Sequence, residues 1–163
     1  MKFLFLSKKI CKMDLKDFLV VSGHPGLFKM VSQGKNVLIV ESLETGHRMP
    51  VHGSTKVSSL EEIAVFTESG DKPLKEVLLL IHDSEGGLVG INPKTATNEE
   101  LRGFMGKILP GYDRDRVYIS DIRKLIVWYN SLVQWGKIEW IPDVQETGDN
   151  QESPETELEN QEN

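Results

Sequence analysis

Residues 14–70 contain short apolar runs that are bounded by Gly, Pro, Asn or Ser, which is the pattern of a β-rich domain. The run at 36–43 is rich in β-branched residues and predicts the best strand of the chain. Two Ser/Glu pairs at 58–62 have the spacing of a capping box and predict one helical turn. Further strands are expected at 27–32, 47–52 and 63–67.

The period of the apolar positions changes to that of a helix after a polar segment at 68–72, which we interpret as a hinge between two modules. Three helices are expected beyond it. The first is capped by Asp71, has Pro73 in its first turn and ends at Gly86. The second opens with a capping box at Thr97 and Glu100 and reaches about Leu109. The third begins at Ser120 or Asp121 and ends at Trp135.

The net charge of −6 is concentrated at the C-terminal end of the chain. Residues 143–163 hold eight acidic residues and no Lys or Arg, which leaves 17 acidic and 19 basic residues in the rest. This segment has almost no apolar side chain to bury, so we expect it to be disordered. The near-neutral remainder lacks the strong positive field of dedicated nucleic-acid-binding proteins.

These patterns predict an α+β protein: a small SH3-like β-barrel followed by a three-helix domain and a disordered acidic tail. The expected division is an N-terminal arm at 1–12, the barrel-like domain at 13–70, the helical domain at 71–142 and the tail at 143–163. Translation from Met1 or from Met13 are both compatible with the sequence, because residues 1–12 are basic and unlike the rest.

Cysteine content and hydropathy favour a cytoplasmic protein that does not enter a membrane. Cys11 is the only cysteine, so no intramolecular disulfide can form. The apolar stretch at 3–6 is shorter than the roughly 7–15 residues of a secretory signal. The later apolar run at 77–81 is far shorter than the ~20 residues of a membrane span.

The sequence contains no pattern that indicates a catalytic, metal or cofactor site. The four histidines have no metal-ligand spacing. Cys11 lies in the N-terminal arm without an associated base, and neither a G-x-S-x-G elbow nor a phosphate-binding loop occurs. We therefore expect no enzyme activity and no cofactor.

One segment, 112–129, interleaves aromatic and basic residues. Its candidate partner-binding residues are Tyr112, Arg114, Arg116, Tyr118 and Arg123. Arg side chains bind phosphate or carboxylate bidentately, and Tyr rings stack on cations or bases. The alternative is structural, because Asp113, Asp115 and Asp121 lie close enough in sequence to neutralise these arginines.

Long parts of the chain closely resemble a family of Bacteroidetes proteins described only as domains of unknown function. The resemblance covers about residues 13–136 and is carried by MDLKDFLVVSGHPGLFKMVSQGKNVLIVESL, KVSSLEEIAVFTE, PLKEVLLLI and LPGYDRDRVYISDIRKLIVWYN. It implies a small cytosolic protein with a barrel-like N-terminal domain and a helical C-terminal domain. It implies no activity and no site residues.

The leading hypothesis for function is a non-enzymatic binding or adaptor protein with a protein partner. The alternatives are an RNA- or ribosome-associated factor, with nucleic acid as the partner of the Tyr/Arg segment, and an enzyme whose site assembles across the fold. The sequence does not fix the oligomeric state.

Overall fold

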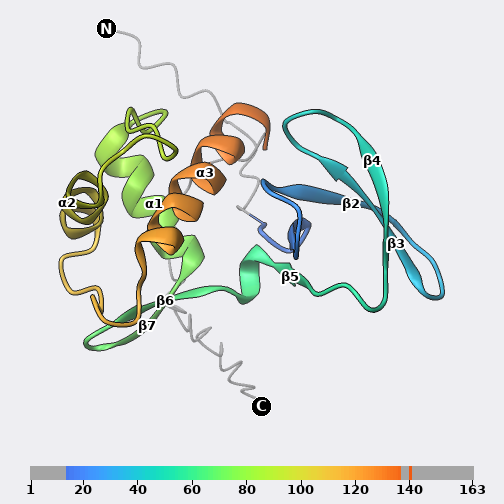
Figure 1. The fold of residues 1–163 in the computed structure, drawn as a ribbon, viewed down its shortest axis with the longest axis horizontal. Coiled ribbons are helices and arrows are strands. Elements are labelled where there is room, and N and C mark those ends of the chain that lie inside the picture. The colour runs from blue at the N-terminus through green and yellow to red at the C-terminus, as the bar shows by residue number, and fades with distance from the viewer. Residues whose placement is uncertain (1–13, 137–139, 141–163) are drawn as a thin grey trace, which may run out of the picture.

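The computed structural model describes residues 14–136 and Trp140, and it confirms the predicted α+β class. Figure 1 shows the sheet at one end of the molecule and the three helices at the other, with a small hairpin beneath the helices. The elements are β1 (Phe18–Val21), β2 (Phe28–Gln33), β3 (Val37–Ser42), β4 (Arg48–His52), β5 (Val57–Ser59), η1 (Leu60–Glu62), β6 (Ala64–Thr67), β7 (Gly70–Pro73), α1 (Leu74–Glu85), α2 (Asn98–Ile108) and α3 (Ile119–Trp135).

The first five strands form one antiparallel sheet in the order β4-β3-β2-β1-β5. Its inner face buries a small apolar cluster of Leu19, Val21, Phe28, Val40 and Val51. The predicted SH3-like barrel is not confirmed, because β4 and β5 are the two edges of an open sheet. The three residues of β5 pair with β1 alone, so no ladder joins the edges within the described part of the chain.

The helical turn expected at 58–62 is present as η1, a 3₁₀ helix that begins one residue beyond β5. The Ser59 hydroxyl accepts a hydrogen bond from the Glu61 amide at 3.3 Å and so caps the turn. Leu60 is fully buried, and it points into the core that the helices form.

The predicted hinge at 68–72 is wrong. Residues of that segment form the turn of a tight hairpin and most of β7, which pairs with β6 from Ala64↔Pro73 to Thr67↔Gly70. Gly70 has φ 123°, a conformation that a side chain would strain, and this allows the chain to reverse directly after β6. Asp71 therefore lies in a strand and caps nothing, and Pro73 is the N-cap of α1.

The three helices have the predicted order, with small shifts at their ends. Gly86 ends α1 in a left-handed conformation, as expected of a C-terminal glycine. The capping box at the start of α2 is confirmed: the Glu100 amide donates to the Thr97 hydroxyl at 3.2 Å, and the Thr97 amide donates to the Glu100 carboxylate at 2.7 Å. Helix α3 begins at Ile119, one or two residues before the predicted start.

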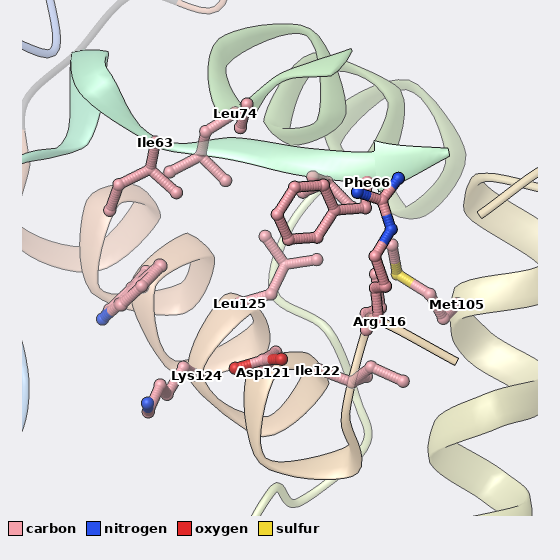
Figure 2. A pocket seen from close by; sticks show the side chains of 13 residues that line it. Ile63, Phe66, Leu74, Met105, Arg116, Asp121, Ile122, Lys124 and Leu125 are labelled. Atoms are coloured by element: carbon pink, nitrogen blue, oxygen red, sulfur yellow. The ribbon is translucent and has the colours of Figure 1, made fainter. Parts of the chain in front are cut away.

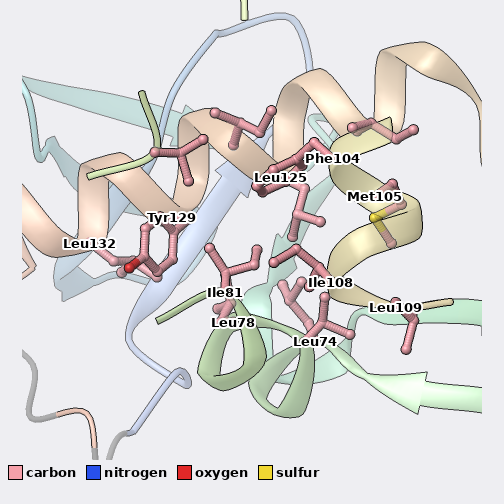
Figure 3. Close-up of a cluster of buried hydrophobic side chains, with 14 of the residues drawn as sticks. Leu74, Leu78, Ile81, Phe104, Met105, Ile108, Leu109, Leu125, Tyr129 and Leu132 are labelled. Carbon is pink, nitrogen blue, oxygen red and sulfur yellow. The ribbon is translucent and has the colours of Figure 1, made fainter. Parts of the chain in front are cut away.

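The main core lies among the three helices and the face of β1 opposite the small cluster (Figure 3). Its helical members include Leu78, Ile81, Leu101, Met105, Ile126 and Tyr129, each fully buried. Leu15, Phe18, Leu27 and Leu60 join it from the N-terminal half. Each such side chain contributes roughly 1.5–3 kcal/mol when it leaves water, so the two halves are stabilised by one shared core. The predicted N-terminal arm and acidic tail lie outside the described residues.

Candidate functional site

A cavity of about 220 Å³ lies between the hairpin strand β6 and the first half of α3 (Figure 2). One wall is formed by residues 63–66 and the other by Val117 and successive turns of α3. Met105 from α2 and Leu74 from α1 contribute apolar surface, and Trp128 lies at one end. Three charged side chains also line the cavity: Arg116, Asp121 and Lys124.

Backbone pairing holds the two walls in place. The connection from α2 to α3 adds to the outer edge of β6, where Tyr112 forms an antiparallel bridge with Thr67. The Asp113 amide donates to the Phe66 carbonyl at 3.0 Å, and the Glu68 amide donates to the Gly111 carbonyl at 2.9 Å. The chain then turns away through residues 114–118 before α3 begins, and the cavity lies where it diverges from β6.

Arg116 connects the two walls. Its Nε atom lies 2.9 Å from Asp113 Oδ2, and its guanidinium carbon lies 4.2 Å from the centre of the Phe66 ring. The hydrogen bond from Arg116, followed by that from the Asp115 amide, holds the pKa of Asp113 below its ordinary value. Phe66 as a residue remains 37% exposed with the guanidinium group over its ring, so a cationic and aromatic surface borders the cavity.

The two charged side chains on α3 differ in how far they are engaged. Asp121 accepts the Tyr118 amide at 2.9 Å and so satisfies a free N–H at the start of the helix. Lys124, one turn later, is exposed and takes part in no ion pair within residues 14–136. The cavity therefore has an ammonium group at its rim that is available to a ligand.

The five residues predicted as a partner-binding surface do not form one patch. Tyr112 is only 2% exposed and belongs to the core, while Arg114 lies over its ring at 5.7 Å. Arg123 is half-buried and donates to the carbonyls of Pro93 and Ala96, so it anchors the loop before α2. Tyr118 is 65% exposed.

Among the five, Arg116 is the residue that lines the cavity. Its pairing with Asp113 also agrees with the structural alternative, in which Asp and Arg neutralise one another. Phe66 and Lys124 complete the site. Phe66 lies on a strand that the sequence predicts, but nothing in the sequence shows which face of that strand is covered.

The described residues also form an open hollow and an aromatic cluster away from this cavity. An open hollow of about 280 Å³ lies between the β2–β3 turn and the residues that connect β4 to β5. At the end of α1, Trp140 stacks on His82 with ring centres 4.7 Å apart, and Tyr129 Oη lies 3.4 Å from His82 Nδ1. Within residues 14–136 and Trp140, no group of three or more His, Cys, Asp or Glu is arranged to hold a metal ion.

Each helix in the described part of the chain is too short or too polar to cross a membrane.

Comparison with known proteins identifies two matched regions and one solved relative. Residues 15–60 match a domain of unknown function, DUF5606, and residues 63–132 match another, DUF6852. No curated protein matches the chain. A solution NMR structure of a protein from Bacteroides vulgatus is 46% identical, with a TM-score of 0.66, and the match covers 78% of this chain and 91% of that one. In this chain a DUF5606 region precedes a DUF6852 region, and the predicted resemblance is confirmed: the chain belongs to the same family as that Bacteroides vulgatus protein.

Proposed function

We propose that this protein is a non-enzymatic, cytosolic binding protein that uses the cavity between β6 and α3 to hold an apolar side chain of a protein partner. The observation that carries the proposal is the cavity itself. It is predominantly apolar, and three charged side chains on the wall formed by Arg116 and α3 border it, an arrangement that is common in recognition pockets.

The lining favours binding over catalysis. Among the described residues that line the cavity, none carries a hydroxyl, thiol or imidazole group. Its one carboxylate, Asp121, accepts the Tyr118 amide at the start of α3. Arg116 is engaged with Asp113 and Phe66, so it is suited to stacking and hydrogen bonding rather than to proton transfer.

The size of the cavity supports a side chain as its occupant. Pockets that enclose drug-sized molecules hold about 300–1,000 Å³. The cavity holds about 220 Å³, which suits one or two apolar side chains of a larger partner.

The test compares two full-length variants that each place a carboxylate on an exposed apolar position. Phe66→Asp alters the cavity rim, and Leu88→Asp is the matched control, because Leu88 is 47% exposed and lies in the loop after α1. Tagged wild type and both variants are used to capture proteins from native lysate, with and without nuclease. We expect a protein that is recovered by the wild type and by Leu88→Asp but not by Phe66→Asp.

If every captured protein is recovered equally by Phe66→Asp, the cavity is not the binding site and the proposal is wrong. If the recovery depends on intact RNA, the alternative of an RNA-associated factor replaces it. Circular dichroism melts of both variants verify that the differences do not reflect unfolding.

A further inference from the structure

The backbone of β6 has one edge that the fold leaves open beside the cavity. The edge toward β7 is paired through Val65↔Lys72 and Thr67↔Gly70, and the Leu74 amide donates to the Ile63 carbonyl at 2.9 Å. Since backbone groups alternate between the two edges along a strand, those of Ala64 and Phe66 point away from β7.

The open edge is already used once for strand pairing. The Phe66 carbonyl accepts the Asp113 amide, and the bridge between Thr67 and Tyr112 lies next to it. After Asp113 the chain diverges, so Ala64 has no strand partner on this side within the described residues. The outward backbone groups of Ala64 are therefore open to an added strand, and the cavity lies beside them.

Charge at the site favours an acidic partner. Arg116, one of the two cations that line the cavity, is already paired with Asp113, so Lys124 is the lining cation that is left for a ligand. The one carboxylate, Asp121, accepts the Tyr118 amide, whereas the ammonium group of Lys124 has no ion pair within residues 14–136. A carboxylate on the ligand would complete this arrangement.

We propose that the partner presents an extended peptide that adds as a strand to the edge of β6 at Ala64 and the Phe66 amide, inserts an apolar side chain into the cavity, and places an acidic side chain near Lys124. Main-chain hydrogen bonds supply affinity in this mode, and the pocket and the charge supply specificity. This inference rests on the proposed function and adds the partner's conformation and chemistry to it.

The probe is a phage-displayed library of random heptapeptides, selected on the full-length protein and counterselected on Phe66→Asp. We expect the enriched peptides to share a bulky apolar residue with Asp or Glu two positions away, because side chains two positions apart in a strand point to the same face. Lys124→Glu should weaken them by at least about tenfold, since it removes a charge-assisted hydrogen bond and places a like charge beside the ligand's carboxylate. Enrichment of basic peptides would contradict the acidic part of the proposal.

The strand addition is tested at Ala64, where a proline removes one outward N–H and leaves the β7 ladder intact. Ile63 precedes this position with φ −87° and ψ 136°, a conformation that suits a residue before proline. Ala64→Pro should weaken the enriched peptides by about five- to tenfold, the effect of one lost hydrogen bond. Ala64→Ser changes the side chain but keeps the N–H, so as the matched control it should weaken the peptides less than Ala64→Pro does.

A second measurement leaves the protein unchanged. An enriched peptide is synthesised with N-methyl groups on alternate backbone amides, and one of the two methylation patterns should abolish binding because it blocks the amides that face β6. Equal binding of both patterns would overturn the strand addition.

The outcomes separate the two proposals. Peptides that depend on Phe66 but bind Ala64→Pro and both methylated forms unchanged would refute the extended mode and leave the proposed function in place. The absence of any peptide that depends on Phe66 would refute both. If peptides bind only after residues 143–163 are deleted, the occupant is this chain's own acidic segment and an external partner is wrong.

Discussion

Two buried tyrosines of the same core are expected to respond in opposite directions to the same substitution. Tyr129 is fully buried, and its hydroxyl donates to the Gly87 carbonyl at 2.7 Å. Tyr112 is 2% exposed, and its hydroxyl is buried without a hydrogen-bond partner in the described part of the chain. Phenylalanine at either position removes one oxygen atom and leaves the ring.

The magnitudes follow from the partners. Tyr129→Phe loses a buried hydrogen bond and leaves the Gly87 carbonyl without its donor, so the free energy of unfolding should fall by about 1–2 kcal/mol. Tyr112→Phe removes a hydroxyl whose burial is uncompensated, so stability should be unchanged or rise by up to about 1 kcal/mol. For a folded part of this size, each kcal/mol corresponds to a shift in melting temperature of roughly 3–5 °C.

Tyr129 also makes stability depend on pH in the alkaline range. Burial, together with the negative charge of Glu85, raises its pKa from 10.0 to about 12. The folded state therefore holds the phenolic proton where the unfolded state has released it, and stability falls as the pH rises from 10 to 12. At pH 11 this loss is up to about 1.4 kcal/mol, and Tyr129→Phe should lack it.

Urea unfolding of the wild type and the two variants at pH 8 and pH 11 measures all three effects. A loss of more than about 1 kcal/mol in Tyr112→Phe would show that its hydroxyl has a partner, and the unsatisfied-hydroxyl argument would be refuted. Equal stability of Tyr129→Phe and wild type at pH 8 would show that the bond to Gly87 contributes nothing. If the stability of Tyr129→Phe falls between pH 8 and pH 11 as much as that of the wild type, the raised pKa of Tyr129 is refuted.

Three further outcomes are expected. Arg116→Ala should raise the pKa of Asp113 toward its ordinary value, measured by NMR titration, while the melting temperature changes little because the pair is exposed. Thr97→Ala should lower stability by about 1 kcal/mol and raise the pKa of Glu100, which the Thr97 amide and hydroxyl now hold low. A fragment of residues 14–62 should show no cooperative melt by circular dichroism, because the face of its sheet that packs on the helices would be exposed.

The sequence predicted best those elements whose signal is local. The capping box before α2, the glycine after α1 and the apolar stripe of α3 depend on residues a few positions apart, and the structure has each of them. Strand β7 was missed because none of its four side chains is a large apolar residue. Its pairing with β6 is a property of the backbone and of the turn at Gly70, which hydrophobic periodicity does not report.

Strand β1 was missed for the opposite reason. Phe18 and Val20 belong to the core that the helices form, and Leu19 and Val21 belong to the small apolar cluster on the opposite face of the sheet. A strand that is covered on both faces reads as a continuous apolar run and lacks the alternation by which strands are recognised.

The candidate site was predictable only in part, because its walls come from separate segments. Local density of Tyr and Arg identified the segment around Arg116, which does line the cavity. The same segment includes Tyr112, which the sequence predicted to be part of the binding surface. Tyr112 pairs with Thr67 through its backbone, and its side chain is buried in the core. The role of Phe66 depends on which edge of β6 is paired, and this is decided by β7 and by the chain after Gly111.

The two family regions meet between residues 60 and 63, yet this is not a boundary in the packing. Leu60, the last residue of the first region, is fully buried in the core of the second, and Phe18 joins it there from β1. The Ile63 carbonyl then accepts the first amide of α1. Because β6 begins one residue after η1, the strand that forms one wall of the cavity is anchored at its start by the buried Leu60 of the first region, and it packs on α1 of the second. A binding site at β6 therefore needs both regions, although only the second contributes side chains to it.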